Sequence, residues 1–200
     1  MSNKYDTPLV ALQNPPGTPM KRGNPGAVEL EEILFPAILN LRANPEQEGL
    51  VEAASQALRL KLPLVPNTTA ASDTHIAYWL SPDEWLIRST ASMPDGGAPL
   101  QQQLEGALAG QFFATTDQSS AYSVMQLRGP QARAVLAKGC PLDLHPSAIG
   151  PGRCAQSHYF RASVLLRPLD EANDAWEIIV RRSFADSTAR VLLDAMEEYL

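Results

Sequence analysis

The chain has 200 residues, of which 44% are hydrophobic, and it carries a formal net charge of −6 with a pI near 5.1. This length suits one domain or two small halves that share a core, and the hydrophobic fraction excludes wholesale disorder. The acidic balance argues against nucleic acid or an anionic membrane surface as a partner.

Three further features concern the cell compartment. No apolar run is long enough to span a membrane. The first residues, MSNKYDTPLVALQNPP, lack the apolar stretch of a signal peptide. Two cysteines do not make a disulfide framework. We therefore expect a reduced, cytoplasmic protein with no membrane partner.

Residues 1–26 contain five prolines and three glycines, and such a density of breakers predicts no regular element. We expect an extended, Pro-rich N-terminal arm, followed by a single domain over residues 27–200. Apolar side chains in the arm mark either a flexible tail or an arm laid on a partner or on its own domain. The candidate partner contacts are Tyr5, Leu9, Leu12 and Met20.

The first half of the domain begins with a strand at residues 33–41, in which Pro36 indicates an edge or a bulge. Asn44 is then a good N-cap, followed by proline at the first helical position, and apolar residues at helical spacing continue to Leu58. Residues 62–72 are an irregular connection.

Two short strands follow at 75–80 and 85–89, joined by a turn at 81–84, and a helix over 100–108 ends the half.

The second half repeats this order. A strand from Phe112 into Tyr122–Arg128 leads to Gly129-Pro130, which starts a helix. Gly139 stands where a helix ends in a left-handed residue. Strands at 158–167 and 176–180 follow, joined by a polar turn at 168–174. Ser183 with Asp186 opens the last helix. The expected buried stripe of that helix is Val191, Leu192, Ala195, Met196 and Tyr199.

Two offsets support an internal repeat. Leu41 and Leu127 each precede an arginine before a Pro-led helix and lie 127 − 41 = 86 residues apart. Trp85 and Trp176, each in a hairpin, lie 176 − 85 = 91 residues apart. We therefore predict an α+β fold of pseudo-duplicated β-α-β-β-α halves, about 27–110 and 111–200. Each half would be ferredoxin-like and borrow a strand from the other.

Cys140, His145, Cys154 and His158 superficially suggest zinc. Structural zinc sites usually pair their ligands on tight knuckles, whereas here each pair mixes Cys with His at looser spacing. We favour a buried thiol and surface histidines. Cys154 and His158 could also lie within reach of each other, but no residue marks the third, orienting group of a nucleophilic site.

Other candidate motifs are weak. Gly150-Pro151-Gly152 loosely matches a dinucleotide fingerprint, yet its proline removes an N–H that a phosphate cradle would use. The adjacent carboxylates Asp83-Glu84 and Glu197-Glu198 do not resemble an acid–base dyad. Arg181-Arg182-Ser183 lies between a strand and a helix, where either an anion or a salt bridge fits. The sequence thus assigns no catalytic, cofactor-binding or metal-ligating residue.

Six segments in order nevertheless resemble the gamma subunit of heterotetrameric sarcosine oxidase, and the likeness covers about residues 28–200. The family is also similar to the folate-binding fold of glycine-cleavage aminomethyltransferases. The six segments are Asn40–Arg42, Ser81–Leu86, Leu127–Ala132, Leu136–Leu144, Gly152–Gln156 and Val180–Ala185.

The resemblance implies one chain of a complex that oxidises sarcosine to glycine, passes the methyl carbon to tetrahydrofolate and produces hydrogen peroxide. Its partners would be alpha, beta and delta subunits. FAD, FMN, NAD, tetrahydrofolate and zinc would lie on those subunits, with no cofactor on this chain. A stand-alone folate-binding, aminomethyltransferase-like protein is the alternative, and an interaction module of another amine-oxidising complex is a third.

Overall fold

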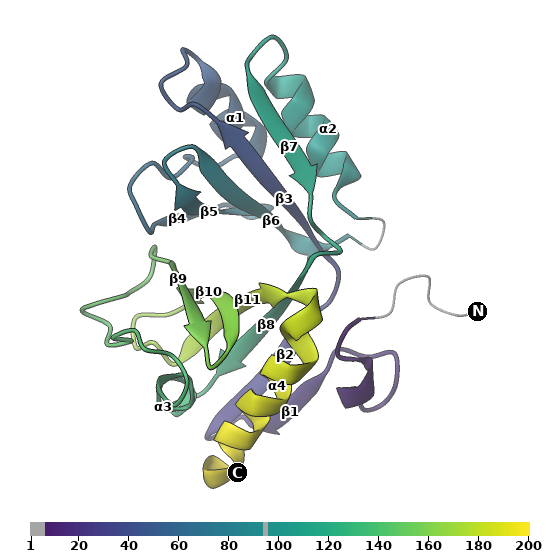
Figure 1. Ribbon diagram of the computed structural model, residues 1–200, viewed down its shortest axis with the longest axis vertical. Coiled ribbons are helices and arrows are strands. Elements are labelled where there is room, and N and C mark those ends of the chain that lie inside the picture. Colours follow the sequence, from purple (N-terminus) through teal and green to yellow (C-terminus); the bar gives the residue numbers. More distant parts are fainter. Residues whose placement is uncertain (1–6, 94–95) are drawn as a thin grey trace. The chain divides into compact units, whose positions relative to one another are not determined.

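The computed structural model describes residues 7–93 and 96–200. The chain divides into two compact units. Unit 2 is the continuous segment Phe35–Ser120, and unit 1 combines the chain up to Leu34 with Ala121–Leu200. Each unit holds one antiparallel sheet, drawn in Figure 1.

Unit 2 is a five-stranded sheet with strand order β4-β5-β6-β3-β7. Helices α1 and α2 pack against each other on one face of it (Figure 1). Its core centres on Trp85, whose indole N–H donates to the Pro63 carbonyl at 2.7 Å. The elements are β3 (Pro36–Ala43), α1 (Leu50–Leu58), β4 (Thr69–Ala71), β5 (His75–Ser81), β6 (Glu84–Ser92), α2 (Ala98–Ala107) and β7 (Phe113–Asp117).

Unit 1 is a six-stranded sheet with strand order β1-β2-β8-β11-β10-β9, and α3 and α4 pack on it. The elements in its N-terminal part are η1 (Val10–Leu12), β1 (Lys21–Asn24) and β2 (Val28–Ile33). The others are β8 (Tyr122–Arg128), α3 (Ala132–Ala137), β9 (Ala155–Tyr159), β10 (Ala162–Pro168), β11 (Ala175–Arg181), α4 (Arg182–Met196) and η2 (Glu197–Tyr199).

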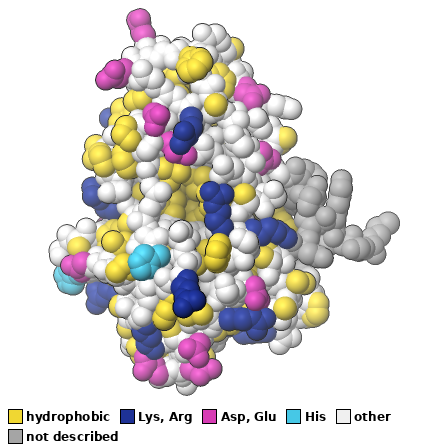
Figure 2. All heavy atoms as spheres, viewed as in Figure 1, with side chains coloured by type: hydrophobic (Ala, Val, Ile, Leu, Met, Phe, Trp, Pro, Cys, Tyr) yellow, Lys and Arg dark blue, Asp and Glu magenta, His cyan; other side chains and the backbone are white. Residues whose placement is uncertain are grey.

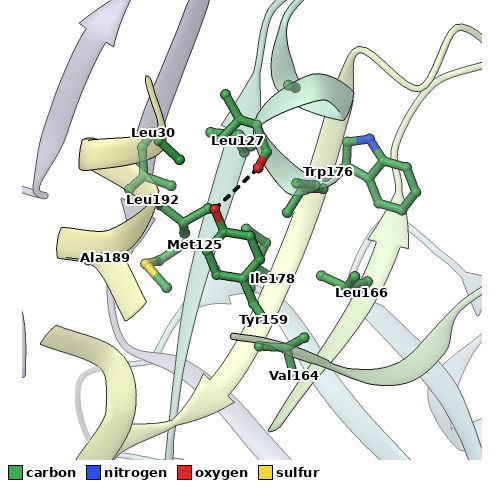
Figure 3. Packing of buried hydrophobic residues seen from close by; sticks show 14 of the residues in the cluster. Leu30, Met125, Leu127, Tyr159, Val164, Leu166, Trp176, Ile178, Ala189 and Leu192 are labelled. Atoms are coloured by element: carbon green, nitrogen blue, oxygen red, sulfur yellow. Dashed lines mark hydrogen bonds between the residues drawn. The ribbon is translucent and has the colours of Figure 1, made fainter. Parts of the chain in front are cut away.

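Figure 3 shows the core of unit 1, where aliphatic side chains of the sheet meet those of α4. The hydroxyl of Tyr159 donates to the Val135 carbonyl at 3.2 Å, which ties β9 to α3. Trp176 is fully buried, and its indole N–H donates to the Asn173 carbonyl at 2.8 Å. Both large polar side chains are therefore satisfied inside an apolar core.

The predicted α+β pseudo-duplication is confirmed by the two strand orders. If β3 is matched with β8 and β6 with β11, the order β4-β5-β6-β3-β7 becomes β9-β10-β11-β8-β2. The registers agree as well, because Leu41 lies opposite Trp85 and Leu127 lies opposite Trp176.

The borrowed strands are β2 and β7. Along the chain β2 leads into β3, yet it pairs with β8; β7 leads into β8, yet it pairs with β3. The units consequently divide after residues 34 and 120, whereas the sequence suggested divisions after 26 and 110.

The N-terminal segment differs from the expected extended arm over its described residues. Residues 21–24 form β1, which pairs antiparallel with β2, and residues 10–12 form a 3-10 turn. Leu9 and Met20 are fully buried in the core of unit 1. The segment belongs to the fold, because its apolar side chains complete that core.

Three predicted strands each prove to be two. The strand expected from Phe112 to Arg128 divides into β7 and β8, which lie in different sheets. Residues 33–41 divide between β2 and β3 at Phe35, and residues 158–167 divide between β9 and β10 at Phe160. These phenylalanines have φ values of 47° and 48°. The irregularity expected at Pro36 is present, because the β3–β6 register shifts between Pro36 and Ile38.

Two helices also begin later in the chain than the sequence predicts. Helix α1 begins at Leu50, because the Asn44 side chain caps a turn by accepting from the Glu46 N–H at 3.0 Å. Helix α3 begins at Ala132, two residues after Pro130.

Gly139 does not adopt a left-handed conformation. A Cβ at that position would lie 2.4 Å from the Phe160 ring, so a larger residue here would require that ring to move.

The last helix begins at Arg182, one residue before the expected opening at Ser183. Leu192, Ala195 and Met196 of the expected stripe are buried, whereas Val191 and Tyr199 are only partly so.

No helix in the described part of the chain is long and apolar enough to cross a membrane.

Candidate functional site

The four residues that suggested zinc do not form a cluster. Cys140 and Cys154 are buried, whereas His145 and His158 are exposed. His145 contacts the Ser147 hydroxyl at 2.7 Å through Nδ1, and His158 contacts the Phe160 carbonyl at 3.0 Å. Across residues 7–93 and 96–200, no group of three or more His, Cys, Asp or Glu is placed to hold a metal ion.

The Arg181-Arg182-Ser183 segment is occupied by internal contacts. The Arg181 guanidinium lies 4.7 Å from the ring centroid of Tyr122 on β8, a cation–π contact. Arg182 acts electrostatically on Glu32 of β2. Arg181 thus contacts an aromatic ring where a salt bridge was expected, and the expected side-chain N-cap of α4 is not formed.

The Gly150–Gly152 segment is a turn. The N–H of Arg153 donates to the Gly150 carbonyl at 3.1 Å, and the chain runs directly into β9. A dinucleotide fingerprint would instead open a helix.

The adjacent carboxylates Asp83 and Glu84 have separate partners. Glu84 accepts from the Arg42 guanidinium at 2.7 Å and from the Asn40 amide at 2.8 Å. The Arg42 contact lowers the pKa of Glu84, against an opposing effect of partial burial. Asp83 accepts from the Ser81 hydroxyl at 2.7 Å. Glu84 therefore forms a structural ion pair with Arg42, and the two carboxylates bind different partners instead of acting together as an acid–base dyad.

The second carboxylate pair lies at the C-terminal end of α4, in η2. Glu198 forms an ion pair with Lys138, whose ammonium also donates to the Ala195 carbonyl at 2.6 Å. These contacts link the end of α4 to the residue that follows α3.

The four candidate partner contacts differ in burial. Leu9 and Met20 are fully buried within unit 1 and present no surface to another chain. Leu12 is partly buried and packs on the same core. Tyr5 lies outside the described residues. A partner contact through the rest of the segment stays a prediction.

A buried carboxylate that we did not predict holds this segment in place. Glu32 is 3% exposed, accepts a hydrogen bond from the Thr7 hydroxyl, and accepts another from the Met20 N–H at 3.4 Å. Burial raises the pKa of Glu32, while these bonds and Arg182 act in the opposite direction. The alternation of Val28, Leu30 and Glu32 along β2 was the available signal, because it places the carboxylate on the core-facing row.

The most exposed large apolar side chain in the described part of the chain is Phe112, at 86%. Its N–H donates to the side-chain amide oxygen of Gln47 at 3.3 Å. Beside it lies an open hollow of about 460 Å³ in unit 2. The residues that line it are Arg42, Ala43, Asn44, Asp83, Phe112, Phe113 and Ala114.

An exposed aromatic ring beside a hollow offers an anchor for a protein partner, because aromatic side chains are enriched in the centres of interfaces. Figure 2 shows hydrophobic side chains and charged side chains of both signs spread over the face that it draws. The Phe112 surface is therefore the best candidate site on this chain.

The chain matches the sarcosine oxidase, gamma subunit family over residues 42–198. It belongs to that family. It is 36% identical to the sarcosine oxidase subunit gamma of Corynebacterium sp. (strain U-96), over 86% of this chain and 81% of that one. It is 37% identical to the subunit gamma of Arthrobacter sp, over 87% and 82% of the two chains.

Solved structures extend the gamma-family assignment to the fold. The heterotetrameric sarcosine oxidase from Corynebacterium sp. U-96, in complex with pyrrole 2-carboxylate, matches with a TM-score of 0.81 and 32% identity. That match covers 98% of this chain and 96% of the other. Glycine cleavage system aminomethyltransferase T from Bartonella henselae matches with a TM-score of 0.59 and 17% identity, over 84% and 46% of the chains. The second likeness concerns the fold alone, and it agrees with the expected aminomethyltransferase-like architecture.

Proposed function

We propose that this chain is the gamma subunit of a heterotetrameric sarcosine oxidase and that it supports assembly of the complex without catalysing a step itself. The observation that carries the proposal is the match of 98% of this chain to 96% of a chain in such an oxidase.

The complex would demethylate sarcosine oxidatively to glycine, transfer the methyl carbon to tetrahydrofolate and reduce oxygen to hydrogen peroxide. Its other chains would be the alpha, beta and delta subunits, which would carry FAD, FMN, NAD, tetrahydrofolate and zinc. We place the complex in the cytoplasm and in one-carbon metabolism.

The non-catalytic role is supported by the contacts of the candidate residues. The thiols of Cys140 and Cys154 are buried, and a nucleophile needs access to substrate. Glu84 is hydrogen-bonded to Arg42, and Arg181 makes a cation–π contact with Tyr122.

The experiment is co-expression of the tagged chain with the alpha, beta and delta subunits from the same organism. We expect all four to co-purify and to consume oxygen when sarcosine is added. The chain purified by itself should show no flavin absorption band and no stoichiometric zinc. As a control, the other three subunits are expressed without this chain, and a smaller yield of assembled enzyme is expected.

The alternative, a stand-alone folate-binding protein, is favoured only by the likeness of the fold to aminomethyltransferase T. The same preparations test it. Stoichiometric binding of tetrahydrofolate to the isolated chain in calorimetry, together with failure to co-purify with the other subunits, would support the alternative and contradict our proposal.

A further inference from the structure

The two sheets match strand for strand except at one edge. In unit 1 the outer edge of β2 is covered by β1, which pairs with it antiparallel. The equivalent strand of unit 2 is β7, and within the described residues its only strand partner is β3. We propose that an extended segment of another sarcosine oxidase subunit pairs antiparallel with the free edge of β7. This inference rests on the proposed function.

Backbone geometry shows which groups β7 presents. The N–H of Gln118 donates to the Ile38 carbonyl at 2.8 Å, so those two residues form a hydrogen-bonded pair. Such pairs alternate along an antiparallel ladder. Ala114 and Thr116 therefore bond to β3. Phe113, Thr115 and Asp117 direct their N–H and C=O groups outward, away from β3.

This edge carries little of the usual protection against pairing, because Asp117 at the end of β7 is the one charged residue of the strand. Natural edges are blunted by lysine, proline, bulges or very short strands. The β7 sequence, Phe-Ala-Thr-Thr-Asp, has no lysine, arginine or proline, and its register with β3 is unbroken. The edges formed by β4 and β9 occupy equivalent places in the repeat, and neither has an added strand. Comparison of the units therefore points to β7 alone.

The residues beside the edge define the occupant. In unit 1, Lys21 of β1 pairs with Glu29 and Glu31 of β2 at 2.9 and 3.5 Å. The positions on β7 that correspond to these two glutamates are Ala114 and Thr116, which are uncharged and exposed.

Phe112 precedes this row and exposes 86% of its surface beside the hollow. The occupant is thus a strand with uncharged, apolar side chains on this face, one of which covers Phe112.

Thr115→Pro tests the backbone pairing. Proline removes an outward N–H and leaves the bonds to β3 intact, a position where edge strands tolerate it. Thr115→Val is the matched control, since it also loses the hydroxyl bond to Glu105 but keeps the N–H. We expect Thr115→Pro to weaken co-purification with the alpha, beta and delta subunits by about tenfold or more, and Thr115→Val to retain it.

Hydrogen exchange in the unmodified chain gives an independent readout. In the isolated chain, the amides of residues 113, 115 and 117 should exchange fast, and those of 114 and 116 should be protected. In the complex all five should be protected. Phe112→Ala should weaken assembly while leaving the unfolding midpoint of the isolated chain unchanged, because the ring is exposed.

The outcomes are distinguishable. If the unmodified chain does not co-purify with the other subunits, the proposed function fails and the β7 inference fails with it. If it co-purifies, but the outward amides still exchange fast and Thr115→Pro assembles normally, only the β7 inference is overturned. Protection of those amides in the isolated chain, together with a concentration-dependent dimer that Thr115→Pro abolishes, would assign the edge to a second copy and overturn it as well.

Discussion

Trp85 and Trp176 occupy equivalent places in the two sheets, each fully buried and each opposite a leucine of the neighbouring strand. Trp176→Ala should lower the free energy of unfolding by about 3–5 kcal/mol, because it empties a large, well-packed site. Urea unfolding measures the loss. Phe112→Ala is the control, an exposed aromatic whose removal should change stability by less than about 0.5 kcal/mol. A loss below about 1 kcal/mol for Trp176→Ala would contradict its core position.

Glu32 should make stability depend on pH. Burial raises the pKa of its carboxyl in the folded chain, so the folded state binds the proton more tightly than the unfolded state does. Its contribution to stability should therefore be lost as pH rises from about 4.3, the ordinary value for glutamate, through the raised folded pKa.

Glu32→Gln removes that titration. As pH rises through the same window, the free energy of unfolding of this variant should increase relative to that of the unmodified chain. The control is Glu171→Gln, which removes an exposed carboxyl. If the difference in unfolding free energy between Glu32→Gln and the unmodified chain does not change with pH, the prediction that burial raises the pKa of Glu32 is wrong.

The two tryptophans were predictable from sequence, because the repeat placed both in hairpins that follow matching Leu-Arg pairs. Glu32 was missed because a charged residue is not expected to face a core. Its partner Thr7 lies 25 residues away, in a segment whose prolines hid any regular structure.

At the scale of elements, two glycines should respond oppositely to alanine. Gly106 lies within α2 with open space around its missing side chain, so Gly106→Ala should stabilise the chain by roughly 0.5–1 kcal/mol. Gly129 has φ of +121°, and a Cβ there would lie 2.4 Å from the Ala27 carbonyl oxygen. Gly129→Ala should therefore destabilise by more than about 1 kcal/mol. Thermal unfolding of both variants measures the two effects. Equal shifts in melting temperature would contradict the prediction.

The same physics explains which elements the sequence revealed. The hairpin of β5 and β6 and the helix α2 followed from local turn and periodicity signals. The breaks at Phe35 and Phe160 did not, because positive φ is ordinarily signalled by glycine or asparagine and here falls on phenylalanine. Strand β1 is stabilised by pairing with β2, a contact that local composition does not encode.

The reciprocal exchange of β2 and β7 is a property of the whole molecule. The sequence repeat predicted that each half borrows a strand, but it did not identify the strand or the resulting boundaries. The candidate docking edge was hidden for the same reason. The sequence around Phe112 indicates a strand, yet only the topology shows that this strand lies at an edge and lacks the partner that β1 gives to β2.

The exchange of β2 and β7 leads us to expect different behaviour from two fragments of nearly equal length. The fragment 35–120 has 120 − 35 + 1 = 86 residues and contains every strand of its sheet, together with both helices and the core around Trp85. The fragment 27–110 has 110 − 27 + 1 = 84 residues, lacks β7, and carries β2 without its partner β8.

We expect 35–120 to unfold cooperatively on heating and to give dispersed amide resonances. In 27–110 the edge of β3 is unpaired and part of the core is open, so we expect a broad transition and poor dispersion. Circular dichroism and amide spectra measure the difference. Equal cooperativity in the two fragments would mean that β7 is not required for unit 2, and that the sequence repeat, rather than the exchanged sheet, defines the folding unit.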